Sequence, residues 1–226
     1  MRPFLPLLAL LGAGCDKSCE DAPGCLLGQD LAAGLLSVRT GATADEVWVT
    51  GATPEPADGT GPVLLHRDGD GWQRVNTSAW AGAELWWGWL GDGEAVFVGN
   101  EGLILEVEGQ QITRAEGPDA DTTFFGVWGA SGDALWAVGQ TAGGQGPPAL
   151  WRRIDGTWAA WEDPDLGPGD DGSVYFKMAG TAADDAWIVG NRGLSLHWDG
   201  ERLTQVPTDT DVETAFERMD VFRAAV

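Results

Sequence analysis

Several residue types are scarce in this chain, and each shortage narrows the functions open to it. The 226 residues include two histidines, three cysteines, one tyrosine and two lysines, Lys17 and Lys177. No phosphate-binding G-x-x-x-x-G-K-[ST] or G-x-G-x-x-G motif follows an expected strand and opens a helix. The G-x-S-x-G nucleophile motif is also missing. We therefore expect no nucleotide binding, no cofactor and no serine hydrolase activity.

Positive charge is scarce as well. The chain has 35 acidic against 13 basic residues, a formal net charge of −22. Such a surface repels phosphate backbones and anionic lipid headgroups, which excludes nucleic acid as a partner. A solvated acidic surface explains this charge, while calcium or a cationic partner is the alternative.

Glycine and tryptophan are abundant instead. The 34 glycines are spread evenly and indicate many tight turns, while the 13 tryptophans favour strands with bulky, half-buried faces. An apolar fraction of 43% is ordinary for a folded protein. Together these features predict an all-β fold.

Residues 1–14 have the order of features of a secretory signal peptide. A basic start at Arg2 precedes a short apolar stretch and the small residues Gly12 to Gly14. Cys15 follows directly and resembles the lipidated cysteine of bacterial lipoproteins, although Gly12 stands where that family usually has leucine. The resemblance implies lipid attachment at Cys15. Ordinary cleavage, with Cys15 in a disulfide, is the alternative.

Residues 15–35 are then expected to form a tether between anchor and body. If Cys15 carries lipid, Cys19 and Cys25 remain as a pair, and export to an oxidising compartment favours a disulfide between them. A loop this short is stabilised by roughly 2–2.5 kcal/mol. Two thiols without nearby histidines fall short of a zinc site.

The body repeats one pattern four times. A short apolar strand ending in glycine is followed by a second strand that closes at Gly51, Gly99, Gly139 and Gly190, which are 48, 40 and 51 residues apart. A third strand then runs into an acid–glycine hairpin, and a fourth strand follows. Four strands per 40 to 50 residues is typical of a β-propeller blade.

The segments Phe125–Gly129, Leu135–Gly139 and His197–Gly200 carry a clear resemblance. They resemble the tryptophan-rich "VWG…DVWAVG…HWDG" repeats of secreted and lipid-anchored propellers of high-GC bacteria. The match covers residues 36–226 and implies a β-propeller domain of four-stranded antiparallel blades. About four blades are present. Met219 to Ala224 restart the first-strand pattern, which favours an incomplete propeller over a closed four-bladed ring.

The recurring indoles are expected to be structural. Blades pack face to face, and one buried tryptophan removes about 200 Å² from water, which corresponds to roughly 5 kcal/mol before entropy. This interpretation covers a second-strand tryptophan in three of the four repeats and a first-strand tryptophan in one: Trp48, Trp136 and Trp187, with Trp128. By the same argument Trp87 and Trp89 belong to the core. Trp80 and Trp86 fit the repeat less well and are the candidates for an exposed ligand-binding platform.

Candidates for chemistry are weak. The two histidines, His66 and His197, occupy a repeat position that also accepts other polar residues, so we interpret them as structural. Five acids crowd the loop around residues 162–171, but the order of calcium-binding loops is missing. The weak calcium candidates in that loop are Asp163, Asp165, Asp170 and Asp171. No metal site is otherwise expected.

The sequence therefore favours a non-enzymatic recognition or scaffolding module, exported and held at a bacterial envelope membrane by lipid alone. Its expected partner is an envelope protein or glycan. One alternative is a propeller-type glycan hydrolase that uses loop carboxylates, since glycosidases need two carboxylates on one sugar. A purely structural role in envelope assembly is a third hypothesis.

Overall fold

The computed structural model describes residues 33–43, 45–52, 59, 61–68, 71–91, 93–141, 146–162, 166 and 172–207. By its contacts the chain divides into residues 1–31 and 32–226, and the described residues all belong to the second unit. The predictions for the signal peptide, for Cys15, Cys19 and Cys25, for the four loop aspartates and for residues 219–224 lie outside the described residues.

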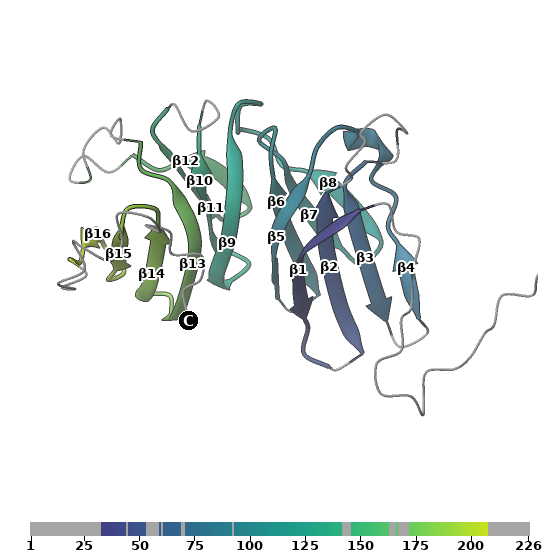
Figure 1. The fold of residues 1–226 in the computed structure, drawn as a ribbon. Coiled ribbons are helices and arrows are strands. Elements are labelled where there is room, and N and C mark those ends of the chain that lie inside the picture. The colour runs from purple at the N-terminus through teal and green to yellow at the C-terminus, as the bar shows by residue number, and fades with distance from the viewer. Residues whose placement is uncertain are drawn as a thin grey trace, which may run out of the picture. The chain divides into compact units, whose positions relative to one another are not determined.

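The described residues form four antiparallel sheets, each made of four consecutive strands in chain order (Figure 1). The first sheet contains β1 (Gly34–Thr40), β2 (Glu46–Ala52), β3 (Val63–Asp68) and β4 (Trp72–Arg74). The second contains β5 (Leu85–Leu90), β6 (Glu94–Gly99), β7 (Ile104–Glu108) and β8 (Gln111–Arg114). The third contains β9 (Thr123–Ser131), β10 (Ala134–Gln140), β11 (Pro148–Ile154) and β12 (Thr157–Ala160). The fourth contains β13 (Tyr175–Ala182), β14 (Asp185–Gly190), β15 (Ser195–Trp198) and β16 (Leu203–Gln205).

This arrangement confirms the all-β prediction and the four-stranded unit. Helical structure is scarce in the described residues, where η3 (Ser78–Trp80) is a single 3₁₀ turn. The acid–glycine turn of the third sheet forms as expected, whereas Glu108 is still paired within β7 and Asp199–Gly200 belong to the longer loop 199–202. Asp155 (φ 49°) and Gly156 (φ 78°) both adopt positive φ between β11 and β12, which is the requirement of a type I′ hairpin.

Each first strand carries a β-bulge at the same place. The pairing with the second strand skips one residue, and these residues are Leu36, Trp86, Phe125 and Phe176. A β-bulge shifts the alternation of side chains along the strand by one residue. Residues beyond the bulge therefore face the side of the sheet opposite to the one that simple alternation predicts. By sequence alone, matching Gly88 with Gly126 aligns Trp87 with Phe125 and Phe176. That alignment was wrong by one residue, since Trp86 is the equivalent position.

Hydrophobic cores lie between successive sheets. Trp48 and Leu64 of the first sheet pack with Phe97 of the second. Further cores join the second sheet to the third and the third to the fourth. The inner strands β1, β5, β9 and β13 contact one another in that order. Sheets packed in series through their faces are the construction of a β-propeller.

Two of the four tryptophans expected to be inter-sheet anchors are buried. Trp48 is 7% exposed and Trp136 is 2% exposed, while Trp128 is half-buried. The prediction was wrong for Trp187, which is 37% exposed on β14. Its position in the strand sends the indole to the face of the fourth sheet opposite the third, and no described sheet covers that face.

A cluster of three indoles fills the core between the third and fourth sheets. Trp136, Trp161 and Trp198 have ring centroids 5.1 to 5.7 Å apart in edge-to-face geometry. The Arg152 guanidinium carbon lies 4.8 Å from the Trp136 ring centroid and 5.1 Å from that of Trp198. Burial lowers the pKa of Arg152. The guanidinium of Arg152 therefore packs against the aromatic rings at the edge of this core through cation–π contacts.

Candidate functional site

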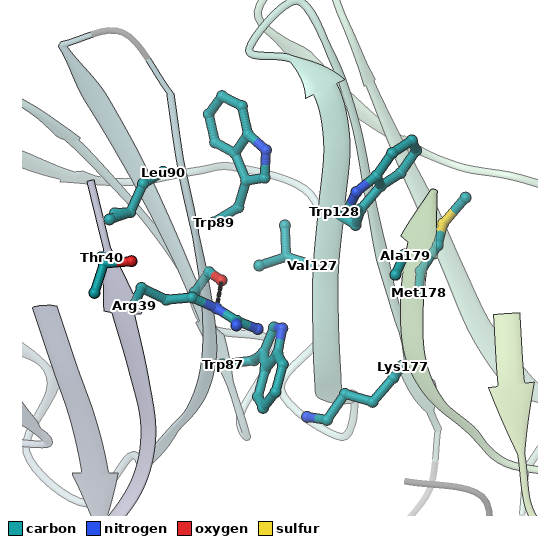
Figure 2. Close-up of a pocket in the computed structure, with 11 residues that line it drawn as sticks. Arg39, Thr40, Trp87, Trp89, Leu90, Val127, Trp128, Lys177, Met178 and Ala179 are labelled. Atoms are coloured by element: carbon teal, nitrogen blue, oxygen red, sulfur yellow. Dashed lines mark hydrogen bonds between the residues drawn. The ribbon is translucent and has the colours of Figure 1, made fainter. Parts of the chain in front are cut away.

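A pocket of about 420 Å³ opens among the four inner strands (Figure 2). Its basic residues are Arg39 of β1 and Lys177 of β13, and its aromatic residues are Trp87 and Trp89 of β5 and Trp128 of β9. The rest of the wall is almost entirely apolar. The pocket is therefore assembled from strands that are far apart in the sequence.

Arg39 reaches across from the first sheet to the second. Its Nε donates a hydrogen bond to the carbonyl oxygen of Gly88 at 2.7 Å, and its guanidinium carbon lies 3.7 Å from the Trp87 ring centroid. Figure 2 shows the hydrogen bond as a dashed line, with the side chain pointing toward Trp87. Burial lowers the pKa of Arg39. One N–H group and one aromatic face thus fix the guanidinium in place.

Lys177 approaches the same indole from the fourth sheet. Its Nζ lies 3.5 Å from the Trp87 ring centroid and donates a hydrogen bond to the carbonyl oxygen of Phe125. Gly126 makes this approach possible, because a Cβ there would lie 2.9 Å from the Phe176 carbonyl oxygen. The missing side chain lets β13 lie close against β9, which brings the amine over the pocket.

The two cations share one aromatic ring without a carboxylate between them. Burial, and secondly the charge of Arg39, lower the pKa of Lys177 to about 7. Within the described part of the chain neither Arg39 nor Lys177 forms an ion pair, whereas Arg67, Arg153 and Arg202 each pair with an acid. In a protein of net charge −22, the pocket is thus a local positive site, and no carboxylate of the described residues pairs with it.

Two of the tryptophans that line the pocket are held by contacts with neighbouring sheets. Trp89 Nε1 donates to the carbonyl oxygen of Gly129 at 2.8 Å, which fixes that indole between the second and third sheets. Trp128 is half-buried against the core between the third and fourth sheets. Such a pocket can hold an anionic group at Arg39 and Lys177 and an apolar group against the other side.

The two tryptophans that the sequence assigned to an exposed platform lie elsewhere and are not exposed. Trp80 ends η3 and packs against the core between the first and second sheets. Trp86 is half-buried, with its ring edge-to-face on Phe125 at 5.4 Å. The expected exposure was wrong for both residues. Their role in ligand binding stays a prediction.

The two histidines occupy the same position of the repeat, and each contacts a tryptophan. The His66 ring is stacked on Trp48 with centroids 3.9 Å apart. His197 Nε2 lies 2.9 Å from a carboxylate oxygen of Asp185, and its ring lies 4.6 Å from that of Trp187. Hydrogen bonds from Thr181 and His197 lower the pKa of Asp185. These contacts describe packing on the sheet faces, and neither histidine lines the pocket.

A second cavity, of about 380 Å³, lies beside the first, and Glu94 is its one acidic lining residue. Arg153 holds that carboxylate at 3.1 Å and also lies 3.1 Å from Glu106. Glu106 in turn accepts a hydrogen bond from Trp158 Nε1 at 2.9 Å. This network ties the second sheet to the third. It leaves the cavity with a single, paired carboxylate.

Sequence reasoning missed the pocket. It treated Trp87 and Trp89 as core and gave Arg39 no role. One signal was present, because Lys177 is one of only two lysines and stands in a first strand of otherwise apolar or small residues. The cluster cannot be seen in the sequence, because Arg39 and Lys177 are far apart in the chain and meet only where β1 packs on β5 and β13 packs on β9.

The described residues hold no group of three or more His, Cys, Asp or Glu side chains placed to bind a metal ion. Nor does the described part contain a helix with the length and apolar character needed to cross a bilayer.

Comparison with known proteins identifies the fold. No family model and no curated protein sequence matches this chain. Among solved structures, YCF48 from Cyanidioschyzon merolae matches with a TM-score of 0.56 and 15% identity over 80% of this chain and 58% of that one. The chain thus spans less than two thirds of that relative. A structure of YCF48 bound to D1 peptide matches at 16% identity, covering 85% of this chain and 73% of that one, with a TM-score of 0.38.

A mutant of the Aleuria aurantia lectin in complex with α-methyl-L-fucoside also matches, at 12% identity over 77% of this chain and 61% of that one, with a TM-score of 0.49. YCF48, which matches with a TM-score above 0.5, is a β-propeller, and the four four-stranded sheets of this chain pack in the same manner. The chain is therefore a β-propeller of four-stranded blades, in agreement with the prediction from its repeats. At these identities the likeness concerns the fold alone.

Proposed function

We propose that this protein is a recognition module that binds a protein or glycan of the bacterial cell envelope in the pocket among its inner strands. The observation that carries the proposal is the convergence of Arg39 and Lys177 on Trp87. Two like charges held close together at a half-buried site repel each other, which raises the free energy of the folded protein. A bound partner that supplies the opposite charge relieves this repulsion.

Binding, rather than hydrolysis, is supported by what lines the cavities. Among the described residues, the larger pocket has no acidic, histidine, serine or cysteine side chain in its wall, and the smaller cavity has only Glu94 and Ser131 of these types. Glycoside hydrolysis uses two carboxylates on either side of one bond. These two cavities do not offer such a pair.

The anchor belongs to the same proposal. The resemblance of residues 1–15 to a lipoprotein leader supports lipid attachment at Cys15 and a location at the envelope membrane, facing the periplasm or the surface. Labelling with an alkyne-bearing palmitate analogue tests this attachment. We expect the wild-type chain to take up the label and to fractionate with membranes. Cys15→Ser should lose both properties, and membrane association that survives this substitution contradicts the proposed anchor.

The recognition role is tested by arrays of envelope peptides and glycans, probed with the wild-type chain and two variants. The double variant Arg39→Met/Lys177→Met removes both charges from the pocket. Arg202→Met is the matched control, since that side chain is 73% exposed and pairs with its neighbour Asp199 outside the pocket. We expect the wild-type and control chains to bind the same probes and the double variant to lose them. Binding unchanged in the double variant, or no binding by any chain, contradicts the proposal.

A further inference from the structure

We propose that the group recognised in the pocket is a carboxylate joined to an apolar group, with the carboxylate held jointly by Arg39 and Lys177. This inference rests on the proposed function and specifies the chemistry of the ligand. Charge, hydrogen-bonding capacity and the nature of the wall each support it.

The charge of the site fits one negative charge. Arg39 is a permanent cation, and the amine of Lys177 is half-protonated near neutral pH because its pKa lies at about 7. Together the two side chains therefore carry between one and two positive charges. A phosphate dianion or a polyanion would be repelled more strongly by the rest of the chain, whose net charge is −22. A monoanion suits this balance best.

The hydrogen-bonding capacity fits a carboxylate. Arg39 uses its Nε for the Gly88 carbonyl oxygen, and its two terminal nitrogens make no hydrogen bond to the described residues. Lys177 donates to the Phe125 carbonyl oxygen, which leaves two more protons when the amine is charged. Arginine donors match the two oxygens of a carboxylate, and charge-assisted hydrogen bonds of this kind are short and strong.

The wall fits an apolar group better than a sugar. Leu90, Val127 and Met178 line the pocket together with the faces of Trp89 and Trp128. Thr40 supplies the one side-chain hydroxyl of the lining. A sugar acid would bring several hydroxyl groups, and most of them would lose their water without gaining a partner. A carboxylate on a branched aliphatic chain leaves no such group unpaired.

Proton uptake should accompany binding. The charged group that faces Lys177 is Arg39 of β1. The other strands around Lys177 contribute uncharged groups: the Trp87 ring from β5, the Phe125 carbonyl oxygen from β9 and the paired residue Val189 from β14. A bound carboxylate restores the charged form of the amine. Above pH 7 each ligand thus brings in about one proton, and affinity falls by roughly tenfold per pH unit until the pKa of the bound state is reached.

The test is a titration of the full chain with a set of small probes, followed by NMR of ¹⁵N- and ¹³C-labelled lysine. Only Lys17 and Lys177 give signals, so binding in the pocket is seen directly. The probes are 4-methylpentanoate, its neutral amide, N-acetyl-leucine, glucuronate and inorganic phosphate. We expect 4-methylpentanoate to bind at least about tenfold more tightly than its amide, as the loss of charged hydrogen bonds implies, and more tightly than glucuronate or phosphate.

The two sources of such a carboxylate are separated by two probes. Tighter binding of N-acetyl-leucine than of 4-methylpentanoate assigns the site to the end of a polypeptide, and the reverse order assigns it to a free organic acid, which would keep the carboxylate but contradict the proposed macromolecular partner. Equal affinity for acid and amide, or a preference for glucuronate or phosphate, overturns the inference. These comparisons use the wild-type chain, so they do not depend on the folding of a variant.

Variants then locate the site. Arg39→Met and Lys177→Met should each weaken 4-methylpentanoate binding by at least about tenfold, while the exposed control Arg202→Met leaves it unchanged. If the arrays show binding that depends on the pocket but the probes show no preference for a carboxylate, the recognition role stands and this inference falls. If neither assay shows binding in the pocket, both fall.

Discussion

The substitution Trp198→Ala should destabilise the protein far more than Trp187→Ala, although both residues lie in the same sheet. Trp198 is 1% exposed and its Nε1 donates to the carbonyl oxygen of Ala183 at 2.9 Å. It also packs against the rings of Trp136 and Trp161. Trp187 is 37% exposed and lies on the other face, where its ring contacts that of His197.

The expected magnitudes follow from burial. Replacing a buried aromatic residue by alanine costs about 3–5 kcal/mol in free energy of unfolding. The partly exposed Trp187 should cost about 1 kcal/mol, because the alanine variant leaves no closed cavity there. For a domain of this size 1 kcal/mol shifts Tm by roughly 2–4 °C. We thus expect losses of about 6–20 °C for Trp198→Ala and about 2–4 °C for Trp187→Ala.

Thermal unfolding followed by far-UV circular dichroism is the suitable assay, because removing an indole changes the fluorescence signal itself. Trp198→Phe is the matched control. It keeps an aromatic ring but loses the hydrogen bond to Ala183, and its Tm should lie between those of the wild type and Trp198→Ala. Equal losses for the two alanine variants would refute the assignment of these indoles to opposite faces of the fourth sheet.

Three further predictions test other contacts. Relative to Lys177→Met, the wild type should gain stability by up to about 1.4 kcal/mol per pH unit as pH rises from 7 toward 10, since the unfolded amine stays protonated there while the folded amine does not. Glu106→Leu should cost roughly 2–4 kcal/mol in urea unfolding, because Arg153 and Trp158 lose a half-buried partner. Gly126→Ala should cost about 1–3 kcal/mol by the same measurement, since the added Cβ presses on β13.

Each of these has a contradicting outcome. A pH profile parallel to that of Lys177→Met would mean that the amine is not buried beside another cation. A loss for Glu106→Leu no larger than that of the exposed control Glu108→Leu would remove the inter-sheet network. An unchanged urea midpoint for Gly126→Ala would show that β9 and β13 are not in close contact at this residue.

The repeat made most of the fold predictable. Glycines that close the second strands, and hairpins such as Asp155–Gly156, mark turns whose chemistry is local, so the strand order follows from the sequence. The bulges were harder to predict. Trp86 and Trp87 are adjacent in β5, and the local sequence does not determine which of the two is equivalent to Phe125 at the bulge. The register of β5 with β6 determines that Trp86 is the equivalent residue.

Burial could be predicted only where a neighbouring sheet exists. Trp136 and Trp187 stand three residues before the closing glycine of their strands, yet the first is covered by the next sheet and the second is not. A sequence pattern specifies which face a residue takes, and it says nothing of what lies on that face. The same holds for Arg39 and Lys177, whose meeting at Trp87 depends on tertiary packing.

The pocket is tested most directly by the titration of Lys177 itself. Two-dimensional NMR of labelled lysine resolves two side-chain signals, and Lys177→Met assigns them. Lys17 lies outside the described residues and serves as an internal comparison. We expect the Lys177 signal to titrate with a pKa of about 7 and to move upward in Arg39→Met, because the guanidinium charge contributes to the shift. A value near the ordinary 10.5 in both proteins would contradict the convergence of the two cations on Trp87.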